Sequence, residues 1–246
     1  MAKTTPARFL TIDIGGSGLK AAVVDRAGAQ LTDRVRVKTP RPCVPDALLE
    51  RLVLLVAPLA PYDRVTVGFP GVVRRGVIIT APNLGSDLAG FDIGSAIEAQ
   101  LGCPTRVAND ATVQGLAAIS GRNVELVVTL GTGFGAALFL DGRPLPTLEL
   151  GHHAFYKGRT YEDRLGNRAL EKHGKKKWNH DLERAIRTTR ALFVFDHLYI
   201  GGGNARHVRL ALDDDTTIIS NDNGVKGGVA LWIGPAARAV EARQPR

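Results

Sequence analysis

A glycine-rich stretch near the N-terminus, Asp13–Lys20, reads DIGGSGLK and contains the residue types that bind phosphate groups. Glycines allow the positive φ values that turn successive backbone amides toward one anion, and Lys20 adds a positive charge. Asp13 would lie at the mouth of the loop, where a carboxylate can hold magnesium through water. A tight hairpin with no ligand is the alternative. The candidate phosphate-contacting residues are Asp13, Gly15, Gly16, Ser17, Gly18 and Lys20.

Two further glycine loops follow strand-like segments. Leu130–Gly135 reads LGTGFG, in which Thr132 offers a hydroxyl donor, and Ile200–Asn204 reads IGGGN. Ligands of open α/β sheets bind at the carboxyl ends of strands, where the second of these loops is expected. One glycine loop is common in proteins, but three after three strands indicate phosphate binding. The additional candidates are Gly131, Thr132, Gly133, Gly201, Gly202 and Gly203.

Asp110 is the candidate for acid–base chemistry. It lies in the string VANDAT, between an expected strand at Arg106–Ala108 and an expected helix at Ala111–Ile119. A carboxylate oriented by such a junction could accept a proton from an alcohol while phosphorus is attacked. The alternative is helix capping, in which Asn109 or Asp110 accepts the first free amides of the helix.

The segment Thr147–His153 places Glu149, His152 and His153 around a glycine in an expected loop. A carboxylate and an imidazole can hydrogen-bond several hydroxyls of one small polyol. The two histidines are adjacent and no third ligand stands at a typical spacing, which disfavours a metal site. Surface histidines without a role are the alternative.

Short strand-like runs alternate with longer helical ones, a pattern typical of α/β proteins with largely parallel sheets. Asp46 and Asp92 precede helical runs and are expected to cap them. The expected strands are Phe9–Ile14, Leu19–Asp25, Val65–Phe69, Arg106–Ala108, Glu125–Leu130, Ala136–Leu140, His197–Ile200 and Thr216–Ser220. The expected helices are Asp46–Ala57, Ile93–Leu101, Ala111–Ile119, Tyr161–His173, Asn179–Phe195 and Val225–Ala242.

An internal repeat aligns without gaps at a shift of 116 residues. Ile12–Asp25 reads IDIGGSGLKAAVVD, and Val128–Asp141 reads VTLGTGFGAALFLD. Each copy consists of an apolar strand, a glycine-rich turn and a second apolar strand that ends on Asp. The repeat predicts two β-hairpins with glycine tips in two related halves of the chain. A chance match between two apolar hairpins is the alternative.

Two common nucleotide-binding motifs are excluded. A Rossmann fingerprint requires a helix directly after its glycines, whereas Leu19–Asp25 is apolar and β-branched and reads as a strand. The string GxxxxGK[ST] of P-loop proteins does not occur in the sequence.

The composition is that of an ordinary globular protein of 246 residues, with 44% hydrophobic and 23% charged residues. The two cysteines, Cys43 and Cys103, form no metal-binding or disulfide pattern. No run of about eighteen apolar residues occurs, so we expect a cytoplasmic protein with no membrane partner. The formal net charge of +8 and the pI near 9.8 indicate an anionic partner, which charge alone does not identify.

Taken in order, these motifs resemble those of the ROK family of sugar kinases, and within it the polyphosphate glucokinase branch. Asp13–Lys20 is similar to that branch's first phosphate motif, and Asn109-Asp110 to the family's catalytic Asn-Asp. The resemblance extends from about Phe9 to Trp232. Its other motifs are an ExGH sugar motif at Glu149–His152, a sugar-contacting Asn-Leu at Ala81–Leu84, a second phosphate loop at Gly131–Gly133 and a glycine run near the nucleotide at Gly201–Gly203.

The resemblance implies phosphoryl transfer to the 6-hydroxyl of glucose or a related hexose, with Asp110 as the general base. It implies the actin/hexokinase-like α/β fold, with two ribonuclease-H-like domains around a central cleft. The first domain is expected at residues 1–108 and the second at 109–224, with a helix in 225–246 packing back on the first. We also expect a homodimer. Sugar hydroxyls would be bound by Asn83, Asn109, Glu149 and His152, and the donor with its Mg²⁺ would face Asp13 and Lys20.

The sequence departs from the family pattern after the ExGH motif. The family commonly carries a CxCGxxGC zinc motif there, but His153–Trp178 contains no cysteine, so no structural zinc is expected. The family's second sugar-binding glutamate follows that motif. Glu162 is the predicted counterpart, with Glu171 as the alternative. No helix-turn-helix segment precedes Phe9, which disfavours the repressor members of the family.

The stretch from Lys157 to Arg190 contains eleven lysines and arginines against five acidic residues, including Lys175-Lys176-Lys177 beside Trp178. A basic track would suit inorganic polyphosphate, whose binding depends steeply on salt, although a solvated helix face is the commoner role of a charge run. We expect polyphosphate, alone or alongside ATP, rather than ATP alone. A non-catalytic sugar- or anion-binding protein with the kinase fold is the alternative. Nucleic acid is not an expected partner, because recognition motifs are missing and only 6% of residues are aromatic.

Overall fold

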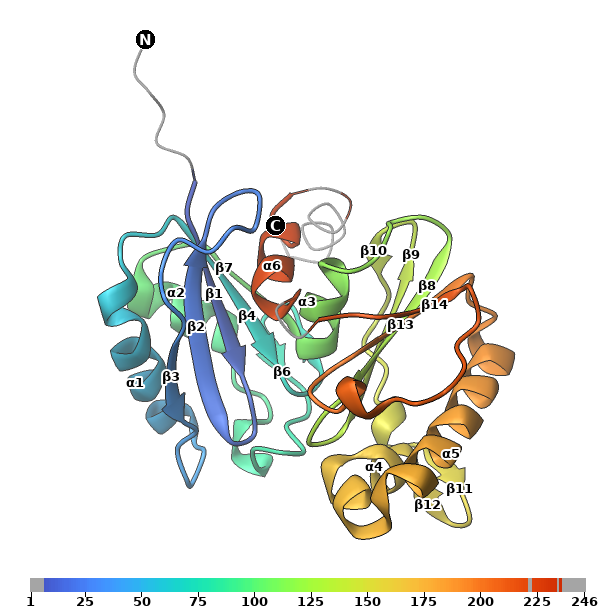
Figure 1. Cartoon of the computed structure of the whole chain (residues 1–246). Helices are drawn as coiled ribbons and strands as arrows, with labels where there is room; N and C mark the ends of the chain where they lie inside the picture. The colour runs from blue at the N-terminus through green and yellow to red at the C-terminus, as the bar shows by residue number, and fades with distance from the viewer. Residues whose placement is uncertain (1–6, 221–222, 234, 236–246) are drawn as a thin grey trace. The chain divides into compact units, whose positions relative to one another are not determined.

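The structure is a computed structural model of the chain, and it describes residues 7–220, 223–233 and 235. The chain divides into two compact units (Figure 1), one formed by Met1–Ala117 and Gly224–Arg246 and the other by Ala118–Asn223. The sequence predicts a division after residue 108, whereas helix α3 (Asp110–Leu116) lies in the first unit. Among the described residues, no helix has the length and apolar character needed to cross a bilayer.

The first unit is built on a five-stranded sheet with the strand order β3-β2-β1-β4-β7. β1, β2 and β3 pair antiparallel, while β4 lies parallel to both β1 and β7. The central strands are apolar and buried on both faces, which is the pattern of a covered parallel sheet. The strands are β1 (Phe9–Ile14), β2 (Gly18–Val24), β3 (Val35–Lys38), β4 (Arg64–Phe69) and β7 (Thr105–Asn109).

The alternation of side chains along β1 gives this sheet two different faces. Leu10, Ile12 and Ile14 point to the face that packs with helices α1 and α2 in one apolar core. Burial of these aliphatic side chains stabilises each by about 1.5–3 kcal/mol relative to exposure. The helices contribute Leu48 and Leu52 from α1 (Pro45–Val56), and Ile93 and Ile97 from α2 (Ile93–Leu101).

The opposite face carries α3 and the C-terminal helix α6 (Asn223–Ala230), which returns to the first unit (Figure 1). Thr66 Oγ1 on β4 donates a hydrogen bond to the carbonyl of Gly228 at 2.7 Å, and Trp232 Nε1 donates to Thr66 Oγ1 at 2.9 Å. A Cβ at Gly228 would lie 2.6 Å from Thr11 Oγ1. Glycine at this position therefore allows α6 to approach the sheet closely.

The second unit repeats the arrangement of the first sheet, with the order β10-β9-β8-β13-β14. β8, β9 and β10 pair antiparallel, while β13 lies parallel to both β8 and β14. The strands are β8 (Val124–Leu130), β9 (Phe134–Leu140), β10 (Arg143–Pro144), β13 (His197–Gly201) and β14 (Thr216–Ile218).

Two helices, α4 (Tyr161–Leu165) and α5 (Asn167–Phe193), pack on one face of the second sheet. Trp178 is fully buried in this core, and its Nε1 donates to the carbonyl of Leu165 at 2.9 Å, which joins the two helices. The shorter elements are β5 (Val73–Arg74), β6 (Val77–Ile78), β11 (Ala154–Tyr156), β12 (Arg159–Thr160) and the 3₁₀ turns Ala57–Leu59, Ser86–Leu88, Leu150–His152 and Ala205–His207.

The two predicted aspartate caps have different outcomes. Asp92 caps α2 as predicted, because its Oδ1 accepts a hydrogen bond from the amide of Ser95 at 2.9 Å. The prediction for Asp46 is wrong, since Val44 is the N-cap of α1 and makes no side-chain cap bond. Pro45 takes the first helical position, where the missing amide is tolerated, and so shifts Asp46 into the first turn.

Helix continuity also differs from the predictions. The expected helix Tyr161–His173 is broken between α4 and α5, and α5 is kinked at Gly174, which has a φ of 74°. The expected helix Val225–Ala242 is interrupted after Ala230, since residues 231–233 are not helical, whereas residue 235 is helical. Its last part, residues 236–242, lies outside the described residues.

The internal repeat corresponds to two hairpins, β1–β2 and β8–β9, as predicted. Ile14 pairs with Leu19 in the first hairpin, whereas Leu130 pairs with Phe134 in the second. The second turn is therefore one residue shorter, and the gapless alignment matches the first strands of the two copies but not the register of the second strands.

Candidate functional site

The first glycine loop is the turn Gly15–Gly18 between β1 and β2, closed by a hydrogen bond from the Gly15 amide to the Gly18 carbonyl at 3.0 Å. The prediction of positive φ values here is wrong for Gly15, Gly16 and Gly18. Close approach explains two of these glycines instead. A Cβ at Gly15 would lie 2.9 Å from the Gly18 carbonyl oxygen, and one at Gly18 would lie 3.1 Å from Arg36 Nε. The amides of Gly16 and Ser17 make no hydrogen bond with the described residues, so these two could bind a phosphate.

Asp13 and Lys20 face each other across β1 and β2, and Lys20 Nζ donates to Asp13 Oδ2 at 3.0 Å. Both side chains are more than a third exposed, so solvent screens the pair. The described residues contain no group of three His, Cys, Asp or Glu side chains that could hold a metal ion. One carboxylate beside a candidate phosphate-binding turn nevertheless fits Mg²⁺, which takes most of its ligands from water and substrate phosphates.

Two residues that sequence reasoning missed, Thr39 and Arg41, contact the first loop. Thr39 Oγ1 donates to the carbonyl of Gly15 at 2.6 Å. Arg41 Nη2 donates to the carbonyl of Gly16 at 2.5 Å and to that of Asn83 at 3.3 Å. The candidate sugar residue Asn83 therefore lies beside the first glycine loop. No local spacing signals these contacts, because they join segments more than twenty residues apart.

Asn109 and Asp110 lie where β7 ends and α3 begins. Asn109 Oδ1 accepts hydrogen bonds from the amides of Ala111 and Thr112 at 3.0 and 3.4 Å, and its Nδ2 donates to the carbonyl of Gly71 at 3.2 Å. Asp110 Oδ1 accepts from the Ala111 amide at 2.8 Å, and its side chain is half-buried. Capping is therefore the role of Asn109 in the helix, and the base role of Asp110 stays a prediction.

The second glycine loop, between β8 and β9, is closed by a hydrogen bond from the Gly131 amide to the Gly133 carbonyl at 3.1 Å. A Cβ at Gly133 would lie 2.1 Å from Glu162 Oε2, whereas one at Gly131 would have no atom within 4 Å. Neither glycine has a positive φ. Gly133 thus leaves space for the carboxylate of Glu162, which lies against this loop.

Glu149, His152 and Glu162 form a cluster in the second unit. Glu149 Oε2 lies 3.6 Å from His152 Nε2. Burial raises the pKa of Glu149, His152 opposes that shift, and the negative charge of Glu162 adds to it. Glu162 is therefore close enough to Glu149 to interact with it electrostatically. Glu171, the alternative, is exposed on α5 and accepts a hydrogen bond from Asn167 at 2.6 Å.

The helix α4 that carries Glu162 is held at both ends. At its start, Thr160 and Asp163 form a capping box in which each side chain accepts from the other's amide at 3.1 Å. Farther along, Arg164 Nη1 lies 3.7 Å from Asp181 Oδ2 on α5, and both side chains are largely buried. These contacts orient Glu162 toward Gly133.

The third glycine loop follows β13 and touches the second. Gly202 has a φ of 86°, and a Cβ there would lie 2.3 Å from the carbonyl oxygen of Leu130. The Asn204 amide donates to the Leu130 carbonyl at 2.9 Å, and Asn204 Nδ2 donates to the Gly131 carbonyl at 3.2 Å. The structure therefore brings the second and third candidate loops together.

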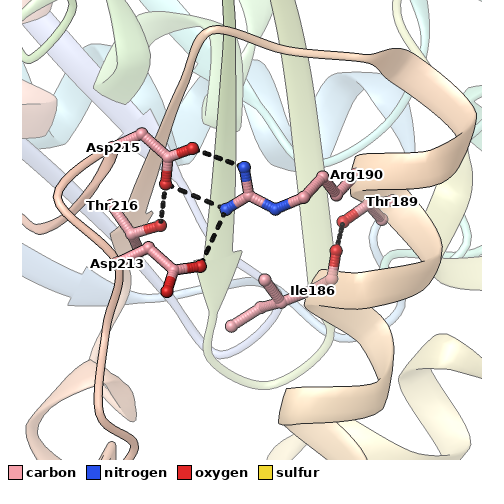
Figure 2. Close-up of polar contacts among 6 residues, drawn as sticks. All are labelled: Ile186, Thr189, Arg190, Asp213, Asp215 and Thr216. Atoms are coloured by element: carbon pink, nitrogen blue, oxygen red, sulfur yellow. Dashed lines mark hydrogen bonds and ion pairs between the residues drawn. The ribbon is translucent and has the colours of Figure 1, made fainter.

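An ion-pair cluster joins α5 to the start of β14 (Figure 2). Both terminal nitrogens of Arg190 bond Asp215, with Nη2 at 2.9 Å from Oδ1, and Nη2 lies 3.4 Å from Asp213 Oδ2. Thr216 Oγ1 also donates to Asp215. The hydrogen bond from Arg190 lowers the pKa of Asp215. The cluster holds β14 beside β13, at whose end the third loop lies.

The predicted basic stretch on α5 is joined to the segment after the third loop by the buried side chain of Asn179. Asn179 Nδ2 donates to the carbonyls of Lys175 and His207, each at 2.9 Å, and its Oδ1 accepts from the amide of Arg209 at 2.7 Å. Loss of solvent and the charges of Lys175, Arg206 and Arg209 lower the pKa of His207. Cations from two segments therefore gather around His207.

Both units have the same topology, with three antiparallel strands followed by two parallel ones and a glycine loop in the first hairpin. These features define an α/β protein of the actin/hexokinase type, as predicted. The ROK family pattern matches residues 9–156. The chain belongs to the ROK family.

Known proteins resemble the chain over most of its length. A polyphosphate glucokinase from Mycobacterium tuberculosis (strain CDC 1551 / Oshkosh) is 32% identical over 213 residues, 81% of this chain and 78% of the relative. The structure of an inorganic polyphosphate/ATP-glucomannokinase from Arthrobacter sp. strain KM matches with a TM-score of 0.81 at 33% identity, covering 91% of this chain and 97% of that one. A ROK family glucokinase from Streptomyces griseus, in complex with glucose and AMPPNP, shares the fold with a TM-score of 0.75 at 18% identity over 92% of this chain and 99% of its own.

Proposed function

We propose that the chain is a sugar kinase that transfers a phosphoryl group from polyphosphate, ATP or both to the 6-hydroxyl of glucose or a related hexose. The observation that carries this proposal is the similarity, over nearly the whole chain, to a polyphosphate/ATP-glucomannokinase. The similarity to a polyphosphate glucokinase supports the same activity. A non-catalytic binding protein with this fold is the less favoured function.

Asp110 is proposed as the general base. The Ala111 amide donates to its Oδ1, which orients the carboxylate at the start of α3. As the sugar 6-oxygen attacks phosphorus, its proton passes to this carboxylate. The bond between phosphorus and the leaving phosphate oxygen breaks, and its electron pair stays on that oxygen. Orientation of the base matters because little covalent chemistry is left for the protein to perform.

The sugar is proposed to be bound by Asn83, Asn109, Glu149, His152 and Glu162. A hydroxyl that donates to Glu149 would stabilise the charge that burial disfavours. Asn109 uses Oδ1 for its cap and one Nδ2 hydrogen for the Gly71 carbonyl, which leaves its second Nδ2 hydrogen for a hydroxyl oxygen.

The donor phosphates are proposed to be bound by the glycine loops and by Lys20, with Asp13 holding Mg²⁺ through water. Bound Mg²⁺ would neutralise negative charge on the donor oxygens. Lys20 and Asp13 pair with each other in the described structure. We propose that donor binding redirects Lys20 toward a phosphate oxygen and leaves the Asp13 carboxylate for the metal-bound water.

A homodimer is proposed as well, as the family resemblance implies. Light scattering after gel filtration measures the mass directly. A mass of one chain at working concentrations would contradict the dimer and leave the proposed activity untouched.

The activity is tested by incubating the protein with glucose, Mg²⁺ and either polyphosphate or ATP, and measuring glucose 6-phosphate. Asp110→Asn should lower kcat by about 10²–10⁴-fold, the usual contribution of a general base, while glucose binding measured by calorimetry is retained. If the parent protein binds glucose but turns over neither donor, a sugar-binding role replaces the kinase role. Turnover with ATP alone would remove only polyphosphate from the proposal.

A further inference from the structure

The edge of the first sheet carries a row of cations beside the first glycine loop. In the antiparallel register, Asp13 lies opposite Lys20, Lys20 lies opposite Arg36, and Gly18 lies opposite Lys38. Directly opposed residues in antiparallel strands share a face, and so do residues two apart on one strand. Lys20, Arg36 and Lys38 therefore extend from the same face of the sheet, next to the turn that ends at Gly18.

Arg36 lies against the loop itself. A Cβ at Gly18 would be 3.1 Å from Arg36 Nε and 3.4 Å from Arg36 Nη2, so the glycine is where the guanidinium packs. Arg36 and Lys38 are both exposed, and neither forms an ion pair within the described residues. The guanidinium thus lies beside the loop without an acidic partner among the described residues.

Arg41 follows the end of β3 and contacts the same loop. Its Nη2 donates to the carbonyls of Gly16 and Asn83, and its remaining N–H groups make no hydrogen bond with the described residues. An arginine has five N–H donors in a planar fork that suits phosphate oxygens. Arg41 can therefore keep both carbonyl contacts and still bind an anion.

Four cations, Lys20, Arg36, Lys38 and Arg41, thus surround one glycine loop, and Asp13 is the one carboxylate paired with any of them in the described structure. Like charges directly opposite in a sheet, such as Lys20 and Arg36, are destabilising. An anion with several charges would remove that repulsion.

We propose that Arg36, Lys38 and Arg41 form a binding site for the phosphates of inorganic polyphosphate that lie beyond the transferred phosphoryl group. This inference rests on the proposed function and specifies its donor. Polyphosphate carries a negative charge on every unit, whereas ATP ends in an uncharged nucleoside after three phosphates. A row of cations that continues along β3 from the loop therefore favours a long anionic chain.

The test compares Arg36→Ala/Arg41→Ala with Arg51→Ala/Arg74→Ala, which removes the same charge from exposed positions on α1 and β5 of the same unit. Long-chain polyphosphate binding is measured without sugar by titration calorimetry at several salt concentrations. KM values for long-chain polyphosphate, tripolyphosphate and ATP are measured separately with saturating glucose. Arg36→Ala alone is included, because Arg36 makes no hydrogen bond with the described residues and its loss should leave folding intact.

In the Arg36/Arg41 variant, the Kd and KM for long polyphosphate should rise about tenfold or more, as expected for the loss of charge-assisted hydrogen bonds. The slope of log affinity against log salt should fall by about 0.7 for each cation removed. The KM for ATP and for tripolyphosphate should change much less, and the control variant should behave as the parent.

Equal effects of the two double variants, or equal losses for ATP and long polyphosphate, would overturn the site. Competition by a single-stranded oligonucleotide as strong as by polyphosphate, at equal phosphate concentration, would also overturn it in favour of a general polyanion surface. If the parent phosphorylates no sugar but polyphosphate binding still depends on Arg36 and Arg41, the proposed function fails and the site remains.

Discussion

Gly133→Ala should weaken sugar binding while leaving the chain folded. The new methyl group would lie 2.1 Å from Glu162 Oε2 and 2.9 Å from its Cδ, well inside van der Waals contact. The atoms that must move are the end of a flexible side chain, so rotation of Glu162 relieves the clash at a cost of about 0.5–1.5 kcal/mol. The carboxylate then leaves its position against Gly133.

The expected loss follows from the hydrogen bond that Glu162 is proposed to make with a sugar hydroxyl. A hydrogen bond to a charged group contributes about 1.5–3 kcal/mol. Because about 1.4 kcal/mol corresponds to a tenfold change in binding, the Kd for glucose should rise about tenfold to a hundredfold.

Titration calorimetry with glucose measures this loss, and thermal unfolding measures stability. Gly131→Ala is the matched control, because it makes the same change in the same loop where no atom lies within 4 Å of the new methyl group. Its glucose Kd should stay close to that of the parent. Gly166→Ala gives the opposite contrast: its Cβ would lie 2.8 and 2.9 Å from two carbonyl oxygens, which cannot rotate away, so its Tm should fall.

An unchanged glucose Kd in folded Gly133→Ala would refute the assignment of Glu162 to the sugar site. Equal losses in Gly133→Ala and Gly131→Ala would refute it too, since the cause would then be the loop backbone rather than the displaced carboxylate.

Two further predictions concern the same unit. Burial and the negative charge of Glu162 raise the pKa of Glu149, while His152 opposes this shift. The glucose Kd should therefore increase as the pH falls toward the pKa of Glu149. Glu162→Gln should move this increase to lower pH in a calorimetric pH series, and an unmoved midpoint would contradict the coupling. Asp181→Ala should destabilise the fold by about 3–5 kcal/mol in urea unfolding, since it leaves Arg164 buried without its partner. Glu183→Ala on the same helix, where the carboxylate is 54% exposed, should cost less than about 1 kcal/mol, and equal costs would contradict burial of the pair.

Local patterns predicted the elements that depend on neighbouring residues. The apolar run Phe9–Ile14 is a strand with the predicted bounds, and the cap at Asp92 forms because side chain and amide are three residues apart. The two glycine-tipped hairpins were recognisable as a repeat, because each needs only an apolar strand, a turn and another apolar strand.

The strand β3 (Val35–Lys38) was missed although it carries two of the three cations of the proposed polyphosphate site, Arg36 and Lys38. Its apolar–charged alternation, VRVK, is a strand signal that could have been found. The pairing of β3 with β2 cannot be predicted in the same way, because the position of Lys20 opposite Arg36 depends on the register between the two strands. The contact of Arg41 with Asn83 likewise joins segments that only the folded chain brings together.

The sequence by itself determined the family, the order of the candidate motifs and the alternation of strands and helices, since each is written in residue type and short spacing. The tertiary structure decided that Glu162 rather than Glu171 lies against the second glycine loop and interacts electrostatically with Glu149. The carboxylate of Glu162 occupies the space that a side chain at Gly133 would need. It also showed that close contacts, not positive φ values, require Gly15 and Gly18. These facts depend on atoms that are distant along the chain and meet only through packing, so no local spacing encodes them.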